Sequence, residues 1–95
     1  MKYEIMFIVR PDMDEAAQKD LIKSFDKLLK DNGAKIDSFK ELGQKELAYE
    51  IEKHKSGFYF LYEISSKDGE AQKEFNRIAN LSEDIIRHMI INISE

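Results

Sequence analysis

The chain has 95 residues, no cysteine and a formal net charge of -4 at pH 7. This length suits a single domain over residues 1–95 with one hydrophobic core, and the absence of cysteine excludes disulfides and thiol chemistry. The negative balance is atypical of nucleic-acid-binding proteins, which usually carry a basic excess. No apolar run is long enough to span a bilayer. The apolar stretch before Arg10 is too short for a signal peptide and has no small-residue cleavage site, so we expect a cytoplasmic protein with no membrane partner.

Alternating apolar residues predict a first strand within the segment "YEIMFIV". One face of this strand is expected to point into the core and carries Tyr3, Ile5, Phe7 and Val9. Met6 and Ile8 make the second face apolar too, which favours a central position in the sheet. The strand ends at Pro11, and Asp12 and Glu15 have the spacing of a helix capping box.

A helix is predicted over residues 14–31, where apolar residues recur at three and four positions and form one stripe. Gly33 is expected to end the helix in the left-handed conformation. An extended segment over residues 35–53 follows, and we expect it at a sheet edge. A bulge is predicted between Ile36 and Phe39 or near Gly43, because the two apolar residues differ in parity.

Residues 54–57, "HKSG", are interpreted as a hairpin loop before an aromatic strand over residues 58–65. The segment "KSGFYFLYEI" loosely resembles the base-stacking strand of RNA-recognition motifs. Strand parity favours a core role for Phe58, Phe60, Tyr62 and Ile64 instead. The stacking alternative would place Glu63 beneath the helices as an uncompensated buried charge.

A second helix over residues 70–80 and a last strand over residues 85–93 complete the order β-α-β-β-α-β. This order predicts an α+β, ferredoxin-like sandwich with a four-stranded antiparallel sheet and two helices on one face. The short tail after residue 93 predicts no further domain. The second face of the sheet is expected to be open.

The open face is expected to carry an apolar patch formed by Met6, Ile8 and Leu61. The last strand adds either Met89 and Ile91 or Ile90, depending on its phase. An exposed apolar patch indicates a protein interface, although a small sheet also tolerates a few exposed aliphatic side chains.

The sequence contains no pattern typical of an enzyme. Two histidines without cysteine provide no metal-ligand cluster at a recognised spacing, and the four glycines form no phosphate-binding loop. We therefore expect no catalysis, no cofactor, no metal and no small-molecule substrate.

The segment "ELGQKELAYEI", residues 41–51, resembles the signature of the bacterial small-subunit ribosomal protein S6 family. That signature is a glycine, two or three polar or basic residues and then Leu-Ala-Tyr-x-Ile. The segments "YEIMFIVRPDMDE", "NGAKIDSFKELG" and "IIRHMII" are similar to the family's first strand, second strand and last strand. The similarity covers nearly the whole chain in one order.

The resemblance implies the same fold and a non-catalytic, structural role in the small subunit of the cytoplasmic ribosome. It also implies a heterodimer with ribosomal protein S18 and binding to the central domain of small-subunit ribosomal RNA. The alternative is a ferredoxin-like homodimeric module for ligand sensing or protein interaction.

Basic side chains meet phosphates without reading sequence, and each could equally be a solvated charge. The candidate RNA-binding residues are Lys2, Lys45, Lys53, Lys55, Arg87 and His88. His88 could instead be a packed or surface histidine with no RNA contact. The candidate partner-interface residues are Met6, Ile8, Lys45, Leu47, Tyr49, Leu61 and Met89. Within that set, Tyr49 could stack on a base or a partner side chain, or pack in the core with Leu47.

The chain departs from the family at the residues after Gly43. Many members have mostly basic residues there, whereas this chain has Gln44, Lys45 and Glu46, and Glu50 and Glu52 follow. Because few phosphates would be neutralised, we expect weak RNA binding by the isolated chain, with a shallow salt dependence. The partner is expected to supply most of the basic surface.

Overall fold

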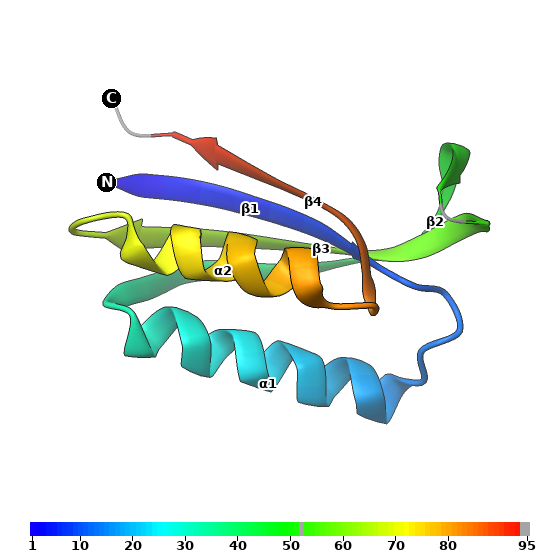
Figure 1. The fold of residues 1–95 in the computed structure, drawn as a ribbon, viewed down its shortest axis with the longest axis horizontal. Coiled ribbons are helices and arrows are strands. Elements are labelled where there is room, and N and C mark those ends of the chain that lie inside the picture. Colours follow the sequence, from blue (N-terminus) through cyan, green and yellow to red (C-terminus); the bar gives the residue numbers. More distant parts are fainter. Residues whose placement is uncertain (52, 94–95) are drawn as a thin grey trace.

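The computed structural model of the protein describes residues 1–51 and 53–93. Its elements are β1 (Lys2–Val9), α1 (Glu15–Asp31), β2 (Ala34–Ile51), β3 (His54–Ser66), α2 (Glu70–Leu81) and β4 (Ile85–Asn92). The strands form one sheet in the order β2-β3-β1-β4 with antiparallel pairing throughout. Both helices lie on one face of this sheet (Figure 1). The predicted ferredoxin-like α+β sandwich is therefore confirmed; Glu52, Ser94 and Glu95, which the predicted single domain includes, lie outside the described residues.

β1 is central, as its two apolar faces predict, because it pairs with both β3 and β4. β2 and β4 form the two edges of the sheet. The prediction that the second strand lies at an edge is therefore confirmed.

α1 begins one residue later than predicted, and its cap differs. Asp14 is the N-cap residue, and its Oδ1 accepts a hydrogen bond from the Ala17 amide at 2.8 Å. The predicted capping by Asp12 is wrong, because Asp12 lies before the first turn and pairs with Arg10 at 3.0 Å. At the other end, Gly33 has φ +86°, which confirms the predicted left-handed residue.

β2 is irregular at the two places that the sequence indicates. Its register against β3 shifts between Ile36 and Ser38 and again between Glu41 and Gly43. Gly43 has φ +86°, a conformation that glycine adopts without steric cost. The predicted bulge is confirmed, and a register shift is present at each of its two alternative positions.

The predicted hairpin loop at residues 54–57 is wrong, because these residues belong to β3. Ser56 and Gly57 pair with Glu46 and Lys45 of β2. The two strands continue pairing out to Ile51 and His54, and the turn contains Lys53 in the left-handed region with φ 69°. The hairpin therefore extends farther from the sheet than the sequence indicates.

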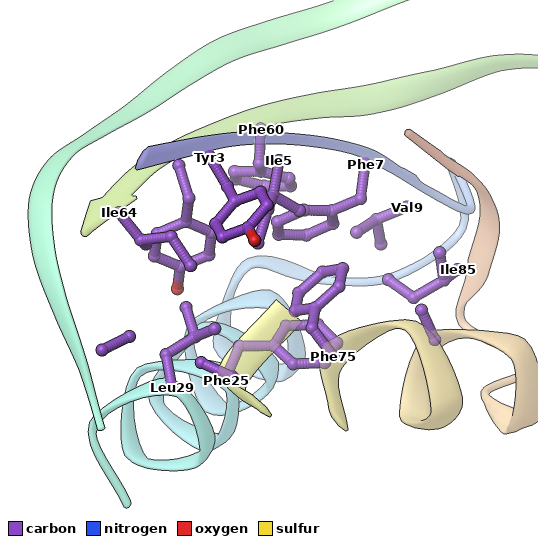
Figure 2. Packing of buried hydrophobic residues seen from close by; sticks show 14 of the residues in the cluster. Tyr3, Ile5, Phe7, Val9, Phe25, Leu29, Phe60, Ile64, Phe75 and Ile85 are labelled. Carbon is purple, nitrogen blue, oxygen red and sulfur yellow. The ribbon is translucent and has the colours of Figure 1, made fainter. Parts of the chain in front are cut away.

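The core lies between the sheet and the helices and is centred on Phe7. Its ring centre is 5.3 Å from that of Phe60 in the sheet, and 5.4 and 5.6 Å from those of Phe25 and Phe75 in the helices. Figure 2 shows the two helical rings pointing toward Phe7. The predicted core residues of β3 are confirmed: Phe60, Tyr62 and Ile64 are buried, and Phe58 is half-buried against the core.

Tyr62 is the one large buried side chain of β3 with a polar end. Its hydroxyl donates a hydrogen bond to Asp26 Oδ1 at 2.6 Å, and the carbonyl oxygen of Ile22 lies 3.3 Å away. Burial, reinforced by the Asp26 carboxylate, raises the pKa of the Tyr62 phenol far above its ordinary value. This contact joins the middle of α1 to the sheet.

Candidate interface on the open face of the sheet

The face of the sheet opposite the helices carries a row of apolar side chains across three neighbouring strands. Met6 in β1 pairs with Leu61 in β3 on one side and with Met89 in β4 on the other. Met6 and Leu61 are half-buried, and Met89 is 44% exposed. We call these three residues the apolar row.

Pairing with β1 determines which residues of β4 join this face. Ile90 pairs with Ile5, a fully buried residue of the core face. Met89 and Ile91 therefore point to the open face, which selects the first of the two phases that the sequence left open. Ile91 is 45% exposed.

Ile8 lies on the same face but is only 4% exposed, so the expectation that it forms part of an exposed patch is wrong. It covers Gly57 of β3: a Cβ atom added there would lie 2.4 Å from Ile8 Cγ2 and 3.4 Å from Ile86 Cδ1. Ile86 is also buried, and neither isoleucine belongs to the main core cluster. Gly57 thus permits a second, small apolar cluster on the open side of the sheet.

Beyond Gly57 the β2–β3 hairpin has no pairing with β1, whose last paired residue, Val9, lies opposite Phe58. We call this part, residues 45–51 and 53–57, the arm. It turns away from the helices at the end of the sheet (Figure 1). The arm therefore borders the open face rather than the helical face.

The arm carries several of the candidate residues. Lys45 holds its ammonium 5.6 Å from the ring centre of Tyr59, a cation–π geometry. Lys53 and Lys55 are exposed, and Leu47 is half-buried. Tyr49 is 61% exposed, so the alternative in which it packs in the core is wrong.

Arg87 of β4 reaches the arm from the opposite edge of the sheet. It pairs with Ile8 and therefore points to the open face, where its Nη1 donates a hydrogen bond to Tyr49 Oη at 2.5 Å. The structure brings together Arg87, Tyr49 and the arm lysines at one end of the open face.

Two other candidate RNA-binding residues lie elsewhere. Lys2 pairs with Ser65, ten residues along β3 from Lys55, which corresponds to roughly 33 Å at about 3.3 Å per residue. His88 pairs with Phe7 and so faces the helices. The six candidates therefore do not form one cluster.

His88 has the packed environment that the sequence left as an alternative. Its Nε2 lies 2.8 Å from Asn76 Oδ1, and its ring is 6.4 Å from that of Phe75 in an edge arrangement. Burial lowers the pKa of His88 below its ordinary value of 6.5. A neutral histidine beneath α2 is poorly placed to meet a phosphate together with Arg87.

Within residues 1–51 and 53–93, no group of three or more His, Cys, Asp or Glu side chains could hold a metal ion. In the same part of the chain, neither helix is long and apolar enough to cross a membrane. The open face carries the apolar row and the cationic side chains of the arm and Arg87, and it also carries two carboxylates, since Glu4 pairs with Glu63 on the same face.

Residues 2–92 match the model of the family described as ribosomal protein S6. The chain belongs to the ribosomal protein S6 family. A relative named small ribosomal subunit protein bS6, from Oenococcus oeni, is 45% identical over 91 residues, which is 96% of this chain. The chain spans 62% of the length of that relative.

A solved structure gives the same assignment. The crystal structure of 30S ribosomal protein S6 from Thermotoga maritima matches with a TM-score of 0.88 and 28% sequence identity. The match covers 95% of this chain and 84% of that one. Both of these similar proteins are named as proteins of the small ribosomal subunit.

Sequence reasoning missed Gly57 and Ile86 as parts of the open face. Gly57 has the sequence context of a turn, and its role depends on Ile8, which is remote in the chain. Ile86 has no paired residue in β1, because the register of β4 shifts between Ile8, which pairs with Arg87, and Val9, which pairs with Ile85.

Proposed function

We propose that this chain is a non-catalytic structural constituent of the small subunit of the cytoplasmic ribosome. In this role it binds the central domain of small-subunit ribosomal RNA together with ribosomal protein S18. The observation that carries the proposal is the match of residues 2–92 to the S6 family. The open face supports it, because the apolar row lies beside exposed cationic side chains of the arm and Arg87 there.

The partner protein is assigned to the open face. The apolar row supplies surface whose burial on association is favourable, and Leu47 of the arm extends it toward one end. Ile8 contributes the floor of this surface rather than an exposed contact, since it is 4% exposed.

The RNA is assigned to the end of the sheet that carries the arm. Lys45, Lys53, Lys55 and Arg87 lie there and can position a phosphate backbone. Lys2 would serve only a separate contact at the far end of β1. Because the formal net charge is -4, we expect the partner to provide most of the phosphate neutralisation.

Binding of a central-domain RNA transcript with and without S18, over a range of salt concentrations, tests the proposal. We expect tight binding only in the presence of S18. For the isolated chain we expect weak binding with a shallow slope of log affinity against log salt concentration. A slope on the isolated chain as steep as that of a protein contacting many phosphates would contradict the proposed division of charge.

The partner surface has a matched pair of test variants. Met89→Asp places a charge in the apolar row and should weaken S18 binding at least about fivefold, as the loss of a buried interface side chain does. Leu81→Asp is the control, because Leu81 is 70% exposed at the end of α2. If the two substitutions weaken S18 binding equally, the open face is not the S18 site.

The alternative of a homodimeric ligand-sensing or interaction module is not favoured by the family assignment. A sedimentation experiment distinguishes between the ribosomal role and this alternative. Cosedimentation with small ribosomal subunits supports the ribosomal role, whereas a free homodimer that binds a metabolite would support the alternative.

A further inference from the structure

A hydrogen bond joins the two edges of the sheet. Tyr49 belongs to β2 and Arg87 to β4, and two strands separate these edges in the sheet order β2-β3-β1-β4. The bond from Arg87 Nη1 to Tyr49 Oη is possible because the arm bends toward the open face.

Arg87 forms no ion pair with a carboxylate in the described part of the chain. Arg10 and Arg77 form ion pairs with Asp84 and Glu74, whereas the side-chain partner of Arg87 is a neutral phenol. A guanidinium has five N–H donors in a planar fork, so donors remain for a second ligand. Arg87 is exposed, which leaves them accessible.

We propose that Tyr49 is a positioning residue that holds the Arg87 guanidinium ready for an RNA phosphate. The inference rests on the proposed function and assigns a role to one side chain within it. A free arginine side chain loses rotamer freedom when it binds. Because Tyr49 already restricts Arg87, part of that entropy is lost before RNA arrives, and the planar fork can meet two phosphate oxygens.

The arrangement also explains why an exposed tyrosine lies at this point of the arm. A phenol can accept a hydrogen bond from arginine without neutralising its charge, whereas a glutamate in that position would compete with the phosphate. The hydroxyl hydrogen of Tyr49 remains available to donate toward the same anion.

A double-mutant cycle of Tyr49→Phe and Arg87→Gln tests this role. The probe is a central-domain transcript of small-subunit ribosomal RNA, bound in the presence of S18 at several salt concentrations. Tyr49→Phe should weaken binding about two- to tenfold, the cost of ordering one flexible side chain, and leave the salt slope unchanged. Arg87→Gln should reduce the magnitude of the slope by about 0.7–0.9, the share of one phosphate contact.

In the Arg87→Gln background, Tyr49→Phe should have no further effect on affinity. Tyr59→Phe is the matched control, since it removes a hydroxyl from the same face and retains the ring beneath Lys45. Without RNA, nuclear magnetic resonance should show an ordered Arg87 guanidinium in the original chain and a mobile one in Tyr49→Phe.

Three outcomes would overturn the inference. An equal loss from Tyr49→Phe in both backgrounds would mean that Tyr49 contacts RNA itself or shapes the arm. Tighter binding by Tyr49→Phe would mean that the hydrogen bond competes with RNA, and unchanged binding would mean that it has no role. If the original chain with S18 does not bind the transcript, the proposed function fails instead, a result that these three outcomes do not produce.

Discussion

Replacing Gly57 with alanine tests how closely the small apolar cluster packs on the open side of the sheet. The added methyl carbon would lie 2.4 Å from Ile8 Cγ2 and 3.0 Å from the carbonyl oxygen of Val9. The second contact is with backbone, which cannot move aside by rotating a side chain. Ile8 is 4% exposed and has little room to withdraw.

The size of the effect follows from two opposing contributions. An overpacked site costs about 1–3 kcal/mol. Gly57 is not among the described glycines with positive φ, so alanine fits its backbone and recovers about 0.4–1 kcal/mol by restricting the unfolded chain. We therefore expect a net loss of roughly 1 kcal/mol in the free energy of unfolding, within a range of about 0–2.6 kcal/mol.

Urea unfolding followed by far-ultraviolet circular dichroism measures this loss. The decisive comparison is Gly57→Ala in an Ile8→Ala background, where the nearest contact is absent. There the cost should fall to less than half, with the remainder due to the Val9 carbonyl. An equal cost in both backgrounds would refute the argument that Ile8 is what requires glycine at this position.

Three further predictions concern the core, a helix cap and a histidine. Tyr62→Phe should lower the free energy of unfolding by about 1–3 kcal/mol, because it removes the hydrogen bond to the Asp26 carboxylate; urea unfolding measures it, and no change would show that the bond adds nothing. Asp14→Ala should lower thermal stability by about 0.5–2 kcal/mol through loss of the N-cap, and a larger effect of Asp12→Ala in the same melting experiment would contradict the cap assignment. Since burial lowers the folded-state pKa of His88 below 6.5, the stability it contributes is present above that pH and declines as pH falls below it. A titration of its ring protons should give a folded-state pKa below that of the urea-unfolded chain, and a value above it would contradict the burial argument.

Several features of the fold could be predicted because they depend on neighbours in the sequence. The alternation in β1 and β3 assigned Phe7, Phe60 and Tyr62 to the core, since side chains of a strand point alternately to its two faces. The left-handed Gly33 followed from the end of the helix, and the irregularity of β2 followed from the differing parity of Ile36 and Phe39.

The phase of β4 could not be predicted, because apolar residues occupy both of its faces. Pairing with β1 placed Met89 on the open face and Ile90 toward the core. The same pairing separated Arg87 from His88, which the sequence presents as adjacent candidates for one RNA contact. Adjacent strand residues share a site only where a bulge or a turn brings them together.

The sequence by itself determined the order of strands and helices, the core faces of β1 and β3 and the resemblance to a ribosomal family, because these depend on local spacing and side-chain type. Tertiary structure alone decided that Gly57 lies beneath Ile8 and that Tyr49 meets Arg87. Both contacts join residues far apart in the chain, and they depend on strand register and on the bend of the arm. Such geometry arises only when the whole sheet has formed.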